Sequence, residues 1–358
     1  MIQKAVAQFA ALDEWESIHL PFFFTIKVGQ ARKAGLRKML ELVRVVGRLL
    51  RIRASGPINL LLYPTGGPQT VPIIRDILLL PWMLLCARRV VLHFHAAGVA
   101  DRFAGRRGDP LRWLLSFIYQ RVAAAVVMTD FNRRDPEFFG IRKIIVCPHR
   151  IPDEFDASLV LRQSDQAGGK RLLYVGHLHP DKGTDALLRA FAAVQSSYPG
   201  LRLELVGECL PPWTNNDVEA LINSLGIRSQ VELSGVLTGR AKAEAFARAD
   251  LFVFPTVAPY ESFGLVLVEA MMWKLPIVAS DWRGNRDVLT SEAGARVFPV
   301  STPFVGALAN ALQDALDRED CWTAWGEQNR ALFDRKYKES AKELWLARAV
   351  LAIDSQTR

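Results

Sequence analysis

Five short apolar runs in the second half of the chain constrain its fold most strongly. The runs are residues 172–175, 203–206, 231–233, 251–254 and 276–279, each bounded by Gly, Pro or Asp. Helical patterns such as Thr184–Gln195 and Gly239–Ala249 lie between them. Strands that are buried on both faces read as continuous apolar runs. The alternation therefore predicts an α/β fold with a parallel sheet covered by helices on both faces.

Ligands of such sheets bind beyond the carboxyl ends of the strands. After the run 251–254, one carboxylate, Glu261, stands just before an expected helix start, and another, Glu269, lies two turns inside that helix. Their spacing of eight residues predicts one helical face, with the carboxylates about 12 Å apart along the axis. Backbone N–H groups at the start of this helix are expected to bind an anion, and they belong to Ser262, Phe263, Gly264 and Leu265. The pattern suits a nucleotide sugar, with the diphosphate between two acceptors for hydroxyl groups.

Motifs in a fixed order extend this pattern. They are Leu172–Gly176 with the turn Lys182–Gly183, then Leu203–Gly207, Val231–Gly235, Ala249–Pro255, Glu261–Glu269 and Pro276–Ser280. In this order and spacing, residues 55 to 335 resemble the retaining glycosyltransferases of family four. That family has the GT-B fold, two Rossmann-like domains with parallel sheets that face each other across a cleft.

The resemblance implies roles for the matching residues. Lys182, with the N–H groups of 263–265, is expected to stabilise the charge on the leaving diphosphate. Glu261 is expected to bind the hydroxyls of the donor sugar and Glu269 the ribose, while the backbone around Gly235 contacts the base. From the residues alone, Lys182 also fits a solvated turn lysine.

Two histidines stand at further matching positions. The family usually has an arginine where this chain has His177, so donor binding is expected to be weaker or dependent on pH. Arg286 is a candidate for the missing positive charge. His95 resembles the family's histidine near the donor sugar and the acceptor, although a structural role at a strand end fits it equally. No clustered carboxylates indicate a metal ion, and no cofactor is implied.

The first half of the chain has the same organisation, with strands expected at 58–63, 89–94, 123–129 and 143–147. We expect a Rossmann-like acceptor domain over 1–162, a linker at Gln163–Lys170 and a nucleotide-sugar domain over 170–335. The resemblance implies that residues 336–358 form a helix that crosses back to the first domain.

The start of the chain departs from the family. Members begin with a strand and a Gly-Gly loop, whereas Met1–Leu12 already has the pattern of the following helix. Ser17–Thr25 then has the pattern of the second strand. The first βα unit is therefore expected to be missing, either because the sequence is internal to a longer protein or because the unit has been lost.

Positive charge is concentrated near the N-terminus. Residues 1–160 hold 23 Lys and Arg against 13 Asp and Glu, whereas the remainder holds 22 against 24. Nine basic residues and one acid, Glu41, lie between Lys27 and Arg53, where apolar residues recur at helical spacing. This basic amphipathic element fits either a solvated domain helix or a site that docks on an anionic membrane surface. No reader motif for nucleic acid accompanies it.

The remaining patterns concern the location of the protein in the cell. The apolar stretch Ile77–Ala87 has 11 residues, too few for the roughly 20 of a membrane span, and is expected to be a buried or interfacial helix with Pro81 in or near its first turn. The four cysteines form no CxxC pair and no signal peptide is evident, which predicts reduced thiols in a cytoplasmic protein. Peripheral attachment at the inner membrane face is an additional expectation.

These features predict a metal-independent retaining glycosyltransferase that moves a sugar from a nucleotide diphosphate sugar to a lipid-linked or glycan acceptor. His177 and the missing first unit leave two alternatives: a GT-B-fold protein that binds a nucleotide sugar or a partner without turnover, and a fragment that is inactive alone. The acceptor, the donor base and the donor sugar are not encoded in any motif of the sequence.

Overall fold

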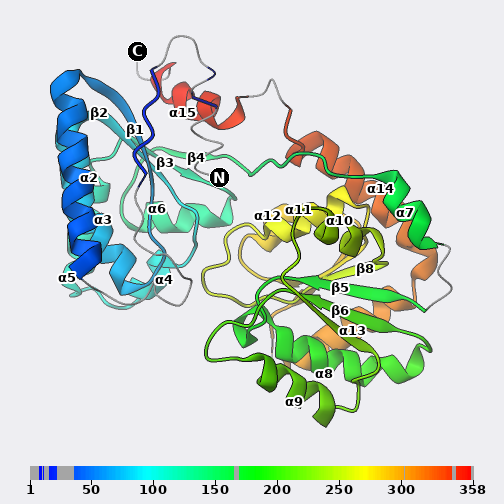
Figure 1. The fold of residues 1–358 in the computed structure, drawn as a ribbon. Helices are drawn as coiled ribbons and strands as arrows, with labels where there is room; N and C mark the ends of the chain where they lie inside the picture. Colours follow the sequence, from blue (N-terminus) through cyan, green and yellow to red (C-terminus); the bar gives the residue numbers. More distant parts are fainter. Residues whose placement is uncertain are drawn as a thin grey trace. The chain divides into compact units, whose positions relative to one another are not determined.

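The chain folds into two compact units in the computed structural model, residues 1–148 with 341–358, and residues 149–340 (Figure 1). The structure describes residues 8, 9, 11, 16–21, 36–164, 169–301, 303–340 and 344–355. Each unit contains one parallel sheet, of four strands in the first and six in the second. The parallel α/β fold that the sequence predicts is confirmed.

The second unit is built on a sheet with the strand order β10-β9-β8-β5-β6-β7. The strands are β5 (Arg171–Val175), β6 (Arg202–Val206), β7 (Val231–Gly235), β8 (Leu251–Phe254), β9 (Ile277–Asp281) and β10 (Ala295–Pro299). The five predicted runs correspond to β5 to β9, whose apolar side chains are almost entirely buried. Strand β10 was not predicted, because an edge strand that contains Arg296, with Val297 and Pro299 exposed, lacks a continuous buried apolar run.

Helices cover both faces of this sheet, as the buried runs require. Figure 1 shows α8 (Thr184–Val194), α9 (Asn215–Ser224) and α13 (Phe304–Leu316) on one face. The other face carries α10 (Gly239–Ala247), α11 (Leu265–Met272), α12 (Asn285–Val288) and α14 (Trp322–Leu332). The helix α7 (Ala157–Ser164) packs beside α10.

The first unit has a sheet with the strand order β1-β2-β3-β4. The strands are β1 (Ile58–Pro64), β2 (Ala87–His93), β3 (Ala124–Val127) and β4 (Ile144–Val146), close to the four predicted segments. The helices are α2 (Leu36–Ser55), α3 (Thr70–Cys86), α4 (Val99–Phe103), α5 (Pro110–Tyr119), α6 (Arg134–Phe138) and α15 (Trp345–Ser355).

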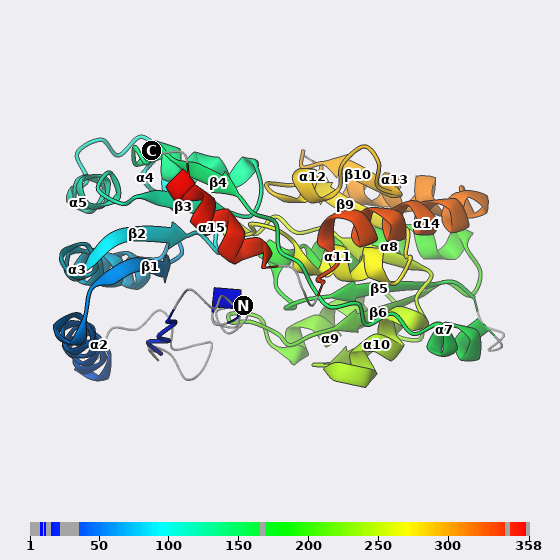
Figure 2. The same ribbon diagram turned by 90° about the horizontal axis from the view of Figure 1, so that it is seen from above.

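Alternate residues of β2 and β3 separate two hydrophobic cores. Val90 and Leu92 pack with residues of α2, α3 and α5, whereas Val91 packs with Trp345, Leu346 and Val350 of α15. Figure 2 shows α2, α3 and α5 as one layer and α15 on the other side of the sheet. Sequence positions 345–350 thus complete the core of the unit that contains β1.

Several expectations about segment limits differ from the structure. Residues 17–21 of the expected strand Ser17–Thr25 have no strand structure, and residues 22–25 lie outside the described residues. Pro81 lies in the interior of α3, not in its first turn. The burial of Leu79, Leu80 and Met83 accounts for a helix that continues through the proline despite the lost hydrogen bond.

The limits of the two units also differ from the domain limits expected at 162 and 170. Residues from His149 onward group with the second unit, because Asp153 pairs with Arg330 and Lys338, and Ile151 bridges to Lys338. The middle of the expected linker, 165–168, lies outside the described residues. The expected C-terminal helix begins at Trp345 instead of Lys336.

Candidate functional site

The sheet of the second unit reverses its strand order between β5 and β8. The chain proceeds from β5 to β6 and β7 on one side, and β8 returns to the other side of β5. In open α/β sheets, ligands bind at such a reversal, beyond the carboxyl ends of the strands. The loop after β5 contains Lys182 and the loop after β8 contains Glu261, so the topology brings these two predicted residues to one place.

The two loops are held together by backbone contacts. The N–H of Val257 donates to the carbonyl of Asp181 at 2.8 Å. Gly183 has a φ of +74°, and a Cβ at this position would lie 2.0 Å from the carbonyl oxygen of Pro255. Only glycine fits here, because the left-handed conformation and the close approach both exclude a side chain. The Lys182–Gly183 turn therefore fixes the backbone position from which the side chain of Lys182 extends.

Lys182 and Glu261 form an ion pair at this point. The Nζ of Lys182 donates to Oε2 of Glu261 at 2.6 Å, and the two side chains are only 13 and 11 % exposed. Oε1 of Glu261 accepts the N–H of Gly264 at 3.2 Å. The Nζ also lies 5.2 Å from the ring centroid of Tyr260. A cation and a carboxylate with little access to water are thus held at the strand reversal.

The helix α11 begins immediately after this pair. Gly264 precedes it with a φ of +63°, and Leu265 and Val266 are its first two residues, whose N–H groups have no acceptor within the helix. Ser262 and Phe263 are buried, and the ring of Phe263 packs edge-on against Tyr337. A ligand at the start of α11 would therefore meet the backbone of this segment and the exposed Leu265.

Glu269 pairs with a different cation. Its Oε1 accepts from Nζ of Lys242 in α10 at 2.7 Å, and its Oε2 is buried without a hydrogen-bond partner in the described part of the chain. Burial raises the pKa of Glu269, and Lys242 opposes this shift. Because 261–264 is not helical, Glu269 lies one turn inside α11, not two, and the two glutamates do not share a helical face.

No sequence pattern pointed to Lys242. Its neighbours in α10 are ordinary helix formers, and it is separated from Glu269 by 27 positions. Only the packing of α10 beside α11 shows that this lysine reaches the carboxylate.

His177 and Gly235 also lie beyond the strand ends. The Nδ1 of His177 is 3.9 Å from a carboxylate oxygen of Glu208, and the pKa of His177 is lowered by burial and by Lys182, against the effect of Glu208. His177 is therefore mostly neutral at pH 7. Gly235 ends β7 with a φ of +65°, and its carbonyl accepts the N–H of Gly207 at 2.8 Å.

His95 belongs to the first unit, two residues after the end of β2. Its ring centroid lies 4.1 Å from that of His93. Burial lowers the pKa of His95 to about 4. The imidazole is therefore neutral at pH 7 and can both donate and accept a hydrogen bond.

Two further observations concern charge. Arg286 is exposed and paired with Asp281, so its guanidinium is already engaged by a carboxylate on the surface. Within residues 36–164, 169–301 and the other described segments, no three His, Cys, Asp or Glu side chains gather as metal ligands do. None of the four cysteines, all of which lie in described segments, forms a disulfide bond.

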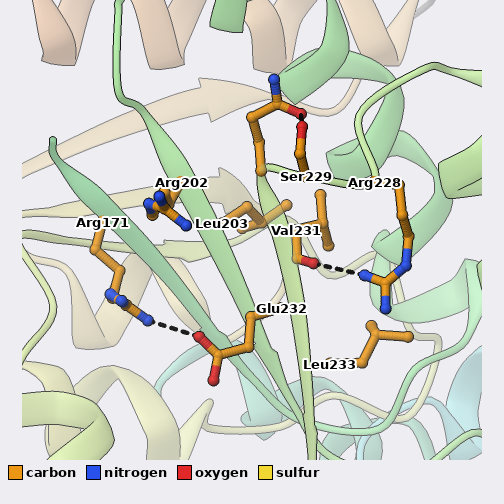
Figure 3. A pocket seen from close by; sticks show the side chains of 9 residues that line it. Arg171, Arg202, Leu203, Arg228, Ser229, Val231, Glu232 and Leu233 are labelled. Carbon is orange, nitrogen blue, oxygen red and sulfur yellow. Dashed lines mark hydrogen bonds and ion pairs between the residues drawn. The ribbon is translucent and has the colours of Figure 1, made fainter. Parts of the chain in front are cut away.

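A polar hollow of about 310 Å³ lies at the opposite edge of the same sheet. Figure 3 shows its arginines: Arg171 pairs with Glu232 at 2.8 Å, and Arg228 donates to the carbonyl of Val231 at 2.9 Å. Arg171, Arg202 and Val231 are the first residues of β5, β6 and β7. The hollow is thus at the amino ends of the strands, away from Lys182.

Residues 169–318 match the family model described as glycosyl transferases group 1. This segment contains all the strands of the second unit as well as Lys182, Glu261 and Glu269. The family match therefore coincides with the sheet whose strand reversal carries the ion pairs.

Curated relatives are similar over a longer segment. Phosphatidyl-myo-inositol mannosyltransferase of Mycobacterium tuberculosis H37Rv is 28 % identical over 211 residues, 58 % of this chain and 53 % of the relative. The Mycobacterium leprae protein of the same name is 34 % identical over 208 residues, 56 % of this chain and 52 % of the relative. Alpha-D-kanosaminyltransferase of Streptomyces kanamyceticus is 26 % identical over 245 residues, 65 % of this chain and 61 % of the relative. The matched region spans about half the length of the mannosyltransferases.

Solved structures share the fold over most of the chain. Sucrose-phosphate synthase from Thermosynechococcus elongatus has a TM-score of 0.68 at 20 % identity, covering 89 % of this chain and 78 % of that one. Anabaena HepE, solved in complex with UDP, has a TM-score of 0.69 at 17 % identity, covering 87 and 80 %. Both are glycosyltransferases of GT-B architecture. Residues 169–318 are thus similar to the glycosyl transferases group 1 family, and the two units of the chain have the GT-B fold.

Proposed function

We propose that the chain transfers a sugar from a nucleotide diphosphate sugar to a lipid-linked or glycan acceptor, with retention of configuration and without a metal ion. The observation that carries this proposal is the Lys182–Glu261 pair beside the start of α11, at the strand reversal of the family segment. A cation beside the N–H groups of Leu265 and Val266, which have no acceptor within the helix, forms a site for a diphosphate.

The proposed chemistry needs no nucleophile from the protein. The bond between the anomeric carbon and the diphosphate oxygen breaks, and the acceptor oxygen bonds to the same face of the sugar. The acceptor proton passes to the leaving diphosphate, which carries away the electron pair of the broken bond. Lys182 and the N–H groups at 263–265 stabilise the charge on that leaving group in a site with little water.

Substitution of His177 for the family's arginine shifts this task toward Lys182. A neutral imidazole contributes a hydrogen bond but no charge, and its lowered pKa keeps it neutral at pH 7. Glu261 then has two partners in the proposed cycle, the ammonium of Lys182 and the hydroxyls of the donor sugar. Gly235 and its neighbours contact the base through the backbone.

Glu269 is proposed to bind the ribose. Its buried, unpaired Oε2 can accept a hydrogen bond from a ribose hydroxyl, while Lys242 balances part of its charge. His95 is proposed to lie near the donor sugar and the acceptor, where a neutral imidazole contributes hydrogen bonds without attracting the diphosphate.

Acceptor and location are proposed from the relatives and from charge. Two relatives named above are phosphatidyl-myo-inositol mannosyltransferases, which supports an acceptor with a lipid part. Helix α2 has six basic residues and one acid, and we propose that the basic segment 27–53 contacts an anionic membrane surface at the cytoplasmic side. Residues 27–35 of this segment lie outside the described residues. No described helix is long and apolar enough to cross a membrane.

Calorimetric titration of the full chain with UDP, GDP and ADP, and with their sugars, tests the donor site. We expect saturable binding of one nucleotide, weakened at least tenfold in Lys182→Ala, because the diphosphate loses a charge-assisted contact. Lys274→Ala is the matched control, since Lys274 pairs with Glu327 on an exposed surface. No binding at millimolar ligand would overturn the proposal.

The same titration separates the enzyme from a protein that only binds. Slow release of free sugar from the bound donor is expected of a transferase, because water replaces the acceptor. Binding without any hydrolysis or transfer to a lipid or glycan acceptor would favour the binding protein, which the glycosyltransferase relatives do not favour.

A further inference from the structure

The outer face of α3 is apolar along its length. Ile74, Leu78, Trp82 and Leu85 recur every three or four residues and are between 42 and 77 % exposed. They form one stripe of roughly 16 Å, on the side of the helix opposite its buried residues. The two charged residues of α3, Arg75 and Asp76, pair with each other and are mostly buried. The stripe therefore carries no charge.

Helix α5 extends this apolar face. It packs beside α3, and its outward residues Trp113 and Phe117 are 66 and 48 % exposed with their rings stacked 5.8 Å apart. We call these six residues of the two helices, Ile74, Leu78, Trp82, Leu85, Trp113 and Phe117, the α3–α5 face. Scattered apolar residues are normal on a protein surface, but a contiguous group of this size indicates a contact with a membrane or with another protein.

Positive charge flanks the face. On the other side of α3 lies α2, whose residues Arg44, Arg48 and Arg51 are exposed and whose only acid is Glu41. At the end of α5, the guanidinium of Arg121 lies 3.5 Å from the ring centroid of Phe117. Figure 2 shows α2, α3 and α5 side by side in one layer. The helices that contain the cations and the apolar stripe therefore cover the same face of the first sheet.

We propose that the α3–α5 face inserts into the headgroup region of an anionic lipid bilayer, with the arginines of α2 against the lipid phosphates. Tryptophan is enriched at membrane interfaces, where its ring is partly in contact with hydrocarbon and partly with water. A helix that lies in the interface combines an apolar side with neighbouring cations, as α3 and α2 do together. The insertion needs no spanning helix.

A second copy of the chain fits this surface less well. A symmetric dimer through the α3–α5 face would bring the same residues of both copies together, including the basic α2 helices. Like charges at an interface weaken association, whereas anionic lipid attracts the same arginines. The proposal rests on the first unit alone. It adds to the proposed sugar transfer by placing a lipid-linked acceptor at the surface where this unit is anchored.

Cosedimentation of the full chain with vesicles tests the proposal. We expect binding to vesicles of phosphatidylcholine with 30 % phosphatidylglycerol, and much weaker binding to phosphatidylcholine alone, because each basic residue contributes roughly fivefold at an anionic surface. In the double variant Trp82→Ser with Leu85→Ser, binding should fall at least tenfold, because two inserted side chains are lost. Val297→Ser, which removes an exposed apolar side chain from β10 of the second unit, should bind like the wild type.

The depth to which the α3–α5 face inserts into the bilayer is measured with brominated lipids, which quench tryptophan fluorescence on contact. Trp82→Phe and Trp113→Phe should each reduce the quenched fraction, whereas substitution of the buried Trp345 by Phe should not. Wild-type binding by the double variant, or no quenching of either ring, would overturn the proposal. A dimer that forms without lipid and dissociates in the double variant would assign the face to self-association and equally overturn it. Far-UV circular dichroism and the thermal unfolding midpoint of every variant report folding, and they do not depend on the donor site.

Discussion

The Nζ of Lys182 lies 2.6 Å from Oε2 of Glu261, although 79 positions separate the two residues in the chain. The other carboxylate oxygen of Glu261 accepts the N–H of Gly264. One carboxylate thus links the cation after β5 to the start of α11. In the proposed donor complex a diphosphate would compete with Glu261 for the ammonium group, so we expect the ion pair to affect both the affinity for the donor and the position of the lysine.

Substitution Glu261→Gln should raise affinity for UDP while lowering the rate of sugar transfer. The amide keeps the acceptor for the Gly264 N–H but no longer neutralises Lys182, so UDP should bind roughly threefold to tenfold more tightly. Transfer should fall because the donor sugar loses a charged acceptor. Calorimetry and initial rates measure the two effects. Glu327→Gln, which breaks an exposed pair with Lys274, should change neither, and equal or weaker UDP binding by Glu261→Gln would contradict the competition.

Substitution Glu269→Ala should weaken UDP binding roughly tenfold to a hundredfold, the effect of a lost hydrogen bond to a charged acceptor. The ribose role is tested by comparison with 2′,3′-dideoxyuridine diphosphate, which has no hydroxyls to donate. The wild type should prefer UDP, and Glu269→Ala should bind both ligands equally. A preference that persists in the variant would assign the ribose to another residue.

Substitution Gly183→Ala should destabilise the second unit by roughly 3 kcal/mol or more, because the new Cβ meets the carbonyl of Pro255 and the φ is positive. Gly226→Ala is the matched control. Gly226 has a φ of +69° but nothing within 4 Å of a Cβ, so only the conformational cost of about 1 kcal/mol remains. Urea denaturation measures both. Equal destabilisation by the two variants would show that the approach of the loops relaxes without cost.

The free energy of unfolding should fall as the pH is lowered, because of His95. Its pKa of about 4 lies below that of an unfolded histidine, near 6.5, so between these values the unfolded chain binds a proton that the folded chain does not. The free energy of unfolding should therefore drop by roughly 2–3 kcal/mol from pH 7 to pH 4.5 through this residue. Urea denaturation at the two pH values should show a smaller drop in His95→Asn. His19→Asn, at an exposed histidine, should retain the wild-type drop; the same drop in both variants would exclude His95 as the cause.

The buried strands could be predicted because burial on both faces leaves a continuous apolar run. The limits of β5 to β9 lie within two residues of the predicted runs for this reason. Strand β10 could not be predicted in this way. It is partly exposed, as an edge strand is, and Arg296 interrupts its apolar residues. The helix α3 was expected from its apolar stretch, but its start at Thr70, before Arg75 and Asp76, depends on tertiary burial of those charges.

The sequence indicated candidate site residues one by one, but not how they pair. Lys182 and Glu261 are each recognisable from local motifs, whereas their contact depends on the order in which β5 and β8 join the sheet. The pairing of Glu269 with Lys242 depends on helix packing and has no local signal. The solvent exposure of the aromatic residues of α3 and α5 could not be predicted either, because the sequence does not show whether an apolar side chain faces the core or the solvent.

The packing of α15 has a consequence for biosynthesis. The carbonyl of Trp345 lies 4.0 Å from the Sγ of Cys147, across 198 positions, and Leu346 and Val350 cover Val91 of β2. When the strands of the first sheet have already left the ribosome, the residues of α15 that cover one face of this sheet have not yet done so. The core around Val91, Ala124 and Val126 is therefore complete only after residue 350 has been synthesised, and until then this face of the sheet is an exposed apolar surface.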